Sequence, residues 1–141
     1  MSLHQPFPRG ATLAARFNAV RAHSMALVDG LSAEDCQLQS MPDASPIKWH
    51  LAHTSWFFET FLLAESNRPP PPFDPAFKVL FNSYYIGVGE RHLRAERGLL
   101  SRPGLERVLQ YRQHVDQHML ALLAEPNLGD SEFDLIELGL Q

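Results

Sequence analysis

The sequence predicts an all-α protein that forms one domain over residues 1–141. Apolar residues recur at helical spacing in four segments, and turns rich in glycine and proline join these segments. No segment shows the strict alternation of apolar and polar residues that is typical of a strand. The length of 141 residues and the hydrophobic content of 45% are sufficient for one domain with a buried core.

Composition and charge exclude several classes of function. Asp and Glu (16) outnumber Lys and Arg (12), and the net charge of −4 argues against a general nucleic-acid binder. The single cysteine, Cys36, excludes an internal disulfide or a cysteine-rich zinc site, and it suits a reducing cytoplasm. Residues 1–10 lack the apolar segment of a signal peptide, and residues 51–64 are too short and too polar to span a bilayer. We therefore expect a cytoplasmic protein with no nucleic-acid or membrane partner.

The first predicted helix runs from about Thr12 to Val28. Its apolar stripe begins at Leu13 and continues at spacings of three and four residues as far as Leu31. Asp29-Gly30 predicts its end, because glycine accepts the left-handed conformation that follows many helices. Ser32 and Asp35 then predict a short capped turn.

The second predicted helix begins at Ser45-Pro46 and runs to about Glu65. Serine can cap the free amides of a first turn, and proline suits the first helical position. This helix is apolar on nearly every side, so it must be covered on more than one side, and we expect an additional partner surface. A homodimer formed through exposed apolar helix faces is one way to provide that surface.

The second half of the sequence predicts a connector and two further helices. Residues 67–75 are proline-rich and predict a stiff, extended linker, whereas the structure of residues 77–89 is not predicted. The third helix begins near Ser101-Arg102-Pro103 and ends before Pro126. The fourth helix begins near Ser131, with acidic residues suited to its N-terminal dipole. The sequence stops at Gln141 without a stop signal, so we expect the fourth helix to be truncated.

Seven histidines give the first indication of chemistry. His53 lies on the inward stripe of the second helix, one turn from Trp49 and one turn from Trp56. Imidazole is the commonest protein ligand of first-row metals, so His53 is a candidate metal ligand; the alternative is a core histidine with a satisfied hydrogen bond. His50 lies on the neighbouring face and could be a second ligand, a hydrogen-bond partner of the first, or a half-buried packing residue.

Two other groups of side chains could bind ligands. His114 and His118 are four residues apart, which is chelating geometry on a helix, but Val115 and Met119 occupy the core stripe, so a solvated pair is favoured over a metal pair. The arginines 94 and 97 are three residues apart and could form a fork for an anionic group such as a substrate carboxylate. The alternative for these arginines is a solvated basic patch paired with nearby glutamates.

Four stretches of the sequence resemble one known family in the same order. The longest is Ser45–Glu59 (SPIKWHLAHTSWFFE), and the others are Phe81–Tyr85, Glu90–Pro103 and Tyr111–Asp116. Together they resemble the N-terminal part of the EgtB family of ergothioneine biosynthesis. The members of this family are non-haem iron sulfoxide synthases. The resemblance covers nearly the whole chain from about Thr12 onward.

This resemblance implies a DinB-like four-helix bundle followed by a catalytic C-terminal domain related to the formylglycine-generating enzyme. It implies an Fe(II) centre held by three histidines, of which one maps onto His53 rather than His50. The other two belong to a His-x-x-x-His-x-Glu motif that follows a segment matched here by Glu137–Leu140, and the sequence ends at Gln141. We therefore expect residues 1–141 alone to bind iron weakly or not at all. The arginines that hold the carboxylate of the thiol substrate are matched by Arg94 and Arg97.

The activity implied for the full-length family is oxygen-dependent. It joins cysteine or γ-glutamylcysteine to hercynine (Nα-trimethylhistidine) as a sulfoxide, and we expect residues 1–141 alone to be inactive. Two alternatives are a non-catalytic helical module that dimerises and a DinB-family metal-dependent hydrolase or thiol transferase. The second alternative would need its remaining histidines elsewhere in this chain.

Overall fold

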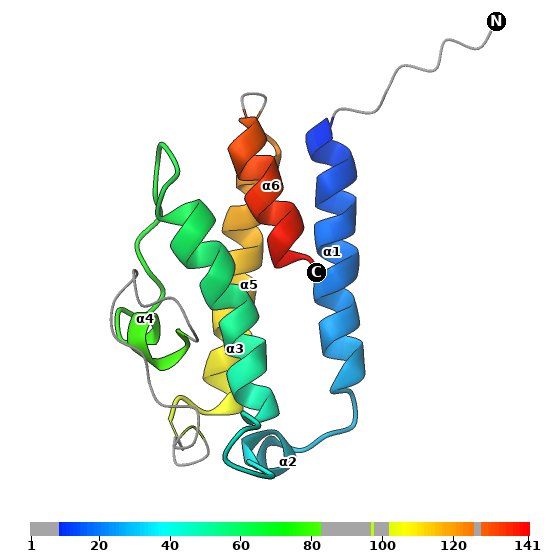
Figure 1. Ribbon diagram of the computed structural model, residues 1–141, viewed down its shortest axis with the longest axis vertical. Helices are drawn as coiled ribbons and strands as arrows, with labels where there is room; N and C mark the ends of the chain where they lie inside the picture. The colour runs from blue at the N-terminus through cyan, green and yellow to red at the C-terminus, as the bar shows by residue number, and fades with distance from the viewer. Residues whose placement is uncertain (1–8, 83–96, 98–101, 126–127) are drawn as a thin grey trace, which may run out of the picture.

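The predicted all-α class is confirmed for the part of the chain that the structure describes. The computed structural model describes residues 9–82, 97, 102–125 and 128–141, where helices are the only extended secondary structure. Helices α1 (Arg9–Leu27), α3 (Ile47–Phe58) and α5 (Leu105–Leu123) run side by side along the long axis (Figure 1). Helix α6 (Asp130–Gly139) lies in the upper half of this view, in front of α5, and is inclined toward α1. The short helix α2 (Ala33–Gln37) lies at the opposite end, and α4 (Phe77–Leu80) lies beside α3.

One hydrophobic core joins these helices apart from α2. Its side chains come from every long helix and from α4, and the largest that are completely buried are Trp56, Tyr111, Phe17, Phe58, Phe77 and Phe81. The apolar residues of α3 pack in or against the core of the chain itself: Ile47 is half-buried, and the others are at most 7% exposed. The observation that favoured an additional partner surface for this helix is therefore removed.

Helix α1 ends as predicted, although its stripe is shorter than predicted. Gly30 adopts a left-handed conformation (φ 83°), and Ser32 and Asp35 form a reciprocal capping box at the start of α2. Leu27 and Leu31, however, are 70% and 41% exposed. They lie at and beyond the last turn of α1, where the chain turns away from the core, so the spacing alone gave a wrong prediction for them.

The start of α3 differs from the prediction. Pro46 occupies the N-cap position, and no side chain caps the first turn. The hydroxyl of Ser45 instead accepts a hydrogen bond from Nη1 of Arg97 at 2.7 Å. Ser45 therefore joins a distant segment to this end of α3 rather than stabilising the helix locally.

The predicted second helix continues beyond α3 as a π-helical turn, η1 (Glu59–Leu63). The amide of Ala64 donates to the carbonyl of Glu59 at 2.9 Å, which is the i→i+5 bond of a π-helix. Such turns are rare in proteins as a whole, but those that occur often lie at functional sites. The helix ends at Leu63, with Ala64 as its C-cap, which agrees with the predicted end at about Glu65.

Close packing between α6 and α3 depends on Gly139. A Cβ atom at this position would lie 2.7 Å from ring carbons of Phe57 and Phe58, which is closer than van der Waals contact allows. Glycine therefore lets the two helices approach here. Within the described residues, no helix is both long enough and apolar enough to cross a membrane.

Candidate functional site

Three rings on one face of α3 form a ladder around His53. The imidazole of His53 stacks on Trp49 with ring centroids 4.7 Å apart and planes 11° apart, and on Trp56 at 5.4 Å and 16°. These residues are three and four positions apart, so the helix places them on successive turns of one face. His53 itself is half-buried.

The ring nitrogens of this ladder donate to backbone carbonyls at the end of α4. Nε1 of Trp56 donates to Lys78 O at 3.1 Å, and Nε1 of Trp49 donates to Leu80 O at 2.8 Å. Nδ1 of His53 lies 2.6 Å from Phe81 O. The last carbonyls of a helix have no partner within the helix, and here aromatic N–H groups of α3 satisfy them.

This arrangement determines which nitrogen of His53 carries the proton. A carbonyl oxygen can only accept a hydrogen bond, so Nδ1 is the protonated nitrogen of the neutral ring. Nε2 then has a lone pair, and none of the described residues hydrogen-bonds to it. Burial lowers the pKa of His53, the hydrogen bond to Phe81 raises it in part, and the neighbouring His50 and Arg97 lower it further, so the ring remains neutral at physiological pH.

The setting of His53 fits one metal ligand but not a complete metal site. Histidines that bind metals usually donate their other ring N–H to a carbonyl or carboxylate, as His53 does. Among the described residues, however, no group of three His, Cys, Asp or Glu side chains is close enough to hold a metal ion. The hydrogen bond to Phe81 would also satisfy a core histidine, so the metal-binding role of His53 stays a prediction.

Arg97 is a buried residue next to this ladder. Its guanidinium carbon lies 3.6 Å above the ring of Trp49, and its nitrogens donate to Ser45 Oγ at 2.7 Å and to Asn82 O at 3.4 Å. With 3% of its surface exposed, Arg97 is not part of a solvated patch. The predicted binding of a substrate carboxylate stays a prediction for Arg97, and Arg94 lies outside the described residues.

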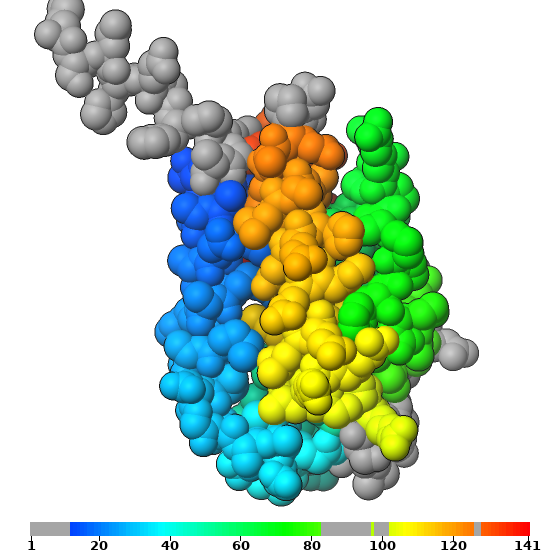
Figure 2. Space-filling view, turned by 180° about the vertical axis from the view of Figure 1, so that it is seen from behind, coloured from blue at the N-terminus to red at the C-terminus, as the bar shows by residue number. Residues whose placement is uncertain are grey.

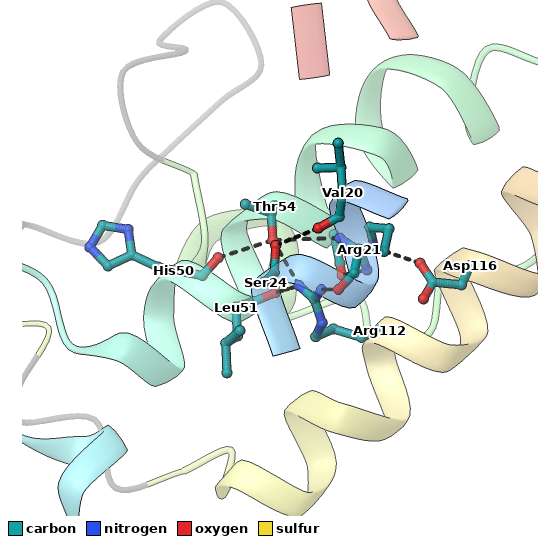
Figure 3. Close-up of polar contacts among 9 residues, drawn as sticks. Val20, Arg21, Ser24, His50, Leu51, Thr54, Arg112 and Asp116 are labelled. Carbon is teal, nitrogen blue, oxygen red and sulfur yellow. Dashed lines mark hydrogen bonds and ion pairs between the residues drawn. The ribbon is translucent and has the colours of Figure 1, made fainter. Parts of the chain in front are cut away.

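His50 occupies a different environment from His53. Its side chain is exposed, and its ring makes an edge contact with Trp49 at 5.4 Å. In Figure 3 the ring points away from the polar contacts between the helices. Of the three alternatives for His50, the half-buried packing residue is therefore excluded by its exposure.

A cluster of buried charges, which the sequence analysis missed, joins α1, α3 and α5 (Figure 3). Arg21 donates from Nε to Asp116 at 2.6 Å and from Nη2 to Ser55 Oγ at 2.5 Å. Nη1 of Arg112 donates to Leu51 O and to Thr54 Oγ1, both at 2.9 Å. The i, i+4 spacing of Arg112 and Asp116 beside the core stripe was the available signal for this cluster.

This cluster holds two guanidinium groups and one carboxylate. Arg21 and Arg112 are 5% and 3% exposed. Burial lowers the pKa of both, and for Arg112 burial and the charge of Arg21 lower the pKa to about 10. Both still carry their charge at neutral pH, so the carboxylate and the surrounding carbonyl and hydroxyl oxygens are needed to stabilise them.

The histidines of α5 pack against the proline-rich segment. The ring of His114 lies 4.6 Å from that of His118 and 5.4 Å from that of Phe73. Both histidines are half-buried, and Nε2 of His114 is buried without a hydrogen-bond partner. The prediction of a solvated pair is therefore wrong, because Phe73 covers this face of α5.

Phe73 fixes the proline-rich segment to the helices. Its ring stacks on Tyr111 at 5.4 Å, and the guanidinium of Arg107 lies 4.1 Å above it. The carboxylate of Glu59 accepts hydrogen bonds from the backbone amide of Phe73 at 3.3 Å and from the hydroxyl of Tyr111 at 2.9 Å. The first residue of the π-helical turn thus joins the connector to α5.

Two surface pockets lie away from His53. One, of ≈ 490 Å³, lies between η1 and the proline-rich segment, and its polar lining residues include Glu59, Glu65 and Lys78. The other, of ≈ 430 Å³, lies between α1 and the end of α6, beside Ser24 and Thr54. His53 lines neither of these two pockets.

Comparison with known proteins identifies one family. A sequence profile described as the DinB superfamily matches residues 16–135, which span most of α1 through the first half of α6. The matched range includes both the His53 ladder and the two histidines of α5. A comparison with curated proteins gives no match.

Proposed function

The chain belongs to the DinB superfamily, and from this premise we propose that it is the N-terminal bundle of an EgtB-like sulfoxide synthase. In this proposal, α1, α3 with η1, α5 and α6 are the four helices of a DinB-like bundle. The complete enzyme uses oxygen to join cysteine or γ-glutamylcysteine to hercynine as a sulfoxide.

The environment of His53 carries the proposal. Its ring is held between Trp49 and Trp56, its Nδ1 is bound to a backbone carbonyl, and burial keeps it neutral. A neutral imidazole with a fixed orientation and an available Nε2 lone pair is what an iron ligand requires. The Leu-Ala-His segment in which the resemblance places the first iron ligand contains this residue.

The other predicted residues have supporting roles in this proposal. Arg97 packs on Trp49, as His53 does, and it would place a positive charge near the iron ligand. Arg94 and Arg97 would bind the carboxylate of the thiol substrate. The two remaining iron ligands would come from the segment that the resemblance places after Gln141.

Iron bound at such a site would supply open positions for oxygen and the sulfur substrate. One imidazole is far below the ligand number of a stable site, so we expect residues 1–141 alone to bind Fe(II) weakly and to show no synthase activity. Stoichiometric, tight Fe(II) binding by the purified chain that is lost in His53→Gln would contradict this expectation.

A chimera tests the proposal directly. Residues 1–141 would replace the matching N-terminal segment of an EgtB enzyme, and formation of the hercynine sulfoxide would be followed by mass spectrometry with cysteine and with γ-glutamylcysteine. We expect an active chimera, and we expect His53→Gln to abolish both its activity and its iron content. The matched control is His50→Gln, which changes an exposed histidine one turn earlier and should retain activity.

Two results would overturn the proposal. One is a folded, iron-loaded chimera with no sulfoxide product; circular dichroism and iron analysis establish folding and loading. The other is full activity in the His53→Gln chimera, because an essential iron ligand cannot be removed without loss.

The alternatives receive less support from the described residues. A metal-dependent hydrolase or thiol transferase would need a complete ligand set, and the described part of the chain has no group of three suitable side chains. The dimerising module was favoured by the apolar faces of α3, which the fold buries. Light scattering that shows a dimer at micromolar concentration would restore the dimerising module as an alternative.

A further inference from the structure

We propose that His114 and His118 form a two-histidine clamp for a divalent ion of the zinc, nickel and copper type. This clamp lies on α5, beside the proline-rich segment, and neither of its residues belongs to the His53 ladder. It is therefore independent of the proposed synthase function and can be tested separately.

The geometry of the pair suits chelation. The two residues are four positions apart on one helix, which brings their rings to a centroid distance of 4.6 Å. Two nitrogens that share a tetrahedral zinc ion, each at about 2.0–2.1 Å, lie roughly 3.3 Å apart. Small rotations of the side chains bring one nitrogen of each ring to that separation, because the rings are already neighbours.

His114 has a buried ring nitrogen that a metal ion could bind. Nε2 is buried and has no hydrogen-bond partner among the described residues. A buried nitrogen without a partner is costly, and a bound ion would satisfy it.

The charges around the pair also favour a cation. Burial lowers the pKa of His114, and the neighbouring His118 lowers it further. The carboxylate of Glu59 on the π-helical turn acts in the opposite direction, because it stabilises positive charge at His114. The same carboxylate would stabilise the positive charge of a bound divalent ion, and the ring need not be protonated for this.

The pair is partly exposed. His114 and His118 are both half-buried, and Gln117 on the same helix is exposed. Figure 2 shows the outer face of α5 between α1 and the segment that contains η1 and α4. No third His, Cys, Asp or Glu within the described residues completes the site, so water would fill the other positions. Binding should follow the order copper above nickel and zinc, with iron weaker.

Calorimetric titration of the tag-free chain with Zn(II) near pH 7.5 tests the proposal. We expect one zinc ion per chain, and an affinity about tenfold or more weaker in His114→Gln and in His118→Gln. Gln117→Ala on the same helix is the matched control and should bind as the unmodified chain does. His53→Gln is measured alongside it to separate the clamp from the site of the proposed function. Circular dichroism of each variant verifies that the helices are retained.

Nitrogen NMR gives a readout that does not depend on affinity. Zinc should shift the resonances of Nε2 in His114 and of one nitrogen in His118, while the nitrogens of His53 stay unchanged. Zinc binding of unchanged affinity in folded His118→Gln overturns the clamp. Zinc binding that is lost only in His53→Gln also overturns it and assigns the ion to the site of the proposed function instead.

Discussion

His53 on α3 and His114 on α5 are both half-buried histidines, but they lie in two different surroundings. Each ring packs against aromatic rings, and burial lowers the pKa of each. His53 lies between two tryptophans of its own helix. His114 instead has a second histidine one turn away and a phenylalanine from the connector above it.

The difference shows how neighbours decide what a neutral imidazole can do. The ladder orients His53 firmly but provides no second ligand among the described residues, so any metal site there depends on other segments. The α5 pair provides two nitrogens but holds them beside a connector rather than within the core. A complete metal site needs both well-oriented ligands and enough of them. In this molecule the ladder orients one histidine, whereas the second histidine side by side with a first is found on another face, on α5.

Removal of the aromatic support should have the largest effect and should distinguish the two regions. Trp56 is completely buried, so Trp56→Ala is expected to cost about 3–5 kcal/mol of unfolding free energy. Phe73 is half-buried, so Phe73→Ala should cost about 1–2 kcal/mol. Urea unfolding followed by circular dichroism measures both. Equal losses would show that the connector is as much a part of the core as the ladder is.

Truncation of the histidines should have a smaller effect. His53→Ala leaves the carbonyl of Phe81 without its donor and opens a space between two indoles, and we expect a loss of about 2 kcal/mol. His114→Ala should lose about 1 kcal/mol, because Nε2 has no hydrogen bond to lose. The control is His53→Gln, whose amide can still donate to Phe81, and it should recover part of the loss in the same unfolding measurement. No recovery would show that ring packing matters more than the hydrogen bond.

The pH dependence of stability should give the smallest effect. Both histidines have a pKa below the ordinary value of about 6.5, so the unfolded chain binds more protons than the folded chain just below that pH. Stability should therefore be complete above about pH 6.5 and fall as the pH decreases, by at most about 1.4 kcal/mol per pH unit for each group.

Urea midpoints between pH 7.5 and 5.5 measure this loss. The slope should decrease in His53→Gln and in His114→Gln, and the decrease should be larger for His53 because two indoles enclose it. A stability that rises as the pH falls through 6.5 would contradict the assignment of both rings as neutral.

The helices were predictable because their determinants are local. Spacing, Gly30 and the capping box at Ser32 predicted the ends of α1 and α2. Ser45 was not predictable in the same way, since its hydroxyl binds Arg97, which is 52 positions away in the sequence. A capping residue and a tertiary hydrogen-bond acceptor have the same local sequence, so the choice between them depends on packing.

The candidate site was predictable only in part, for the same reason. The position of His53 between two tryptophans follows from helical spacing, but its carbonyl partner lies 28 residues away. The exposure of His114 was wrongly predicted because the periodicity of α5 contains no information about Phe73. Arg21 and Arg112 look like ordinary surface cations in sequence, and only the meeting of three helices buries them.

The π-helical turn has a consequence for the evolution and engineering of this chain. A π-turn contains one residue more than an α-turn needs, so it is equivalent to an insertion that rotates everything after it by roughly 100° about the helix axis. Leu62 and Leu63 are buried after that rotation, and Glu59 lies at its start. Relatives that lack the insertion would present a different set of side chains to the connector, and sequence alignments across this turn should allow a gap of one residue.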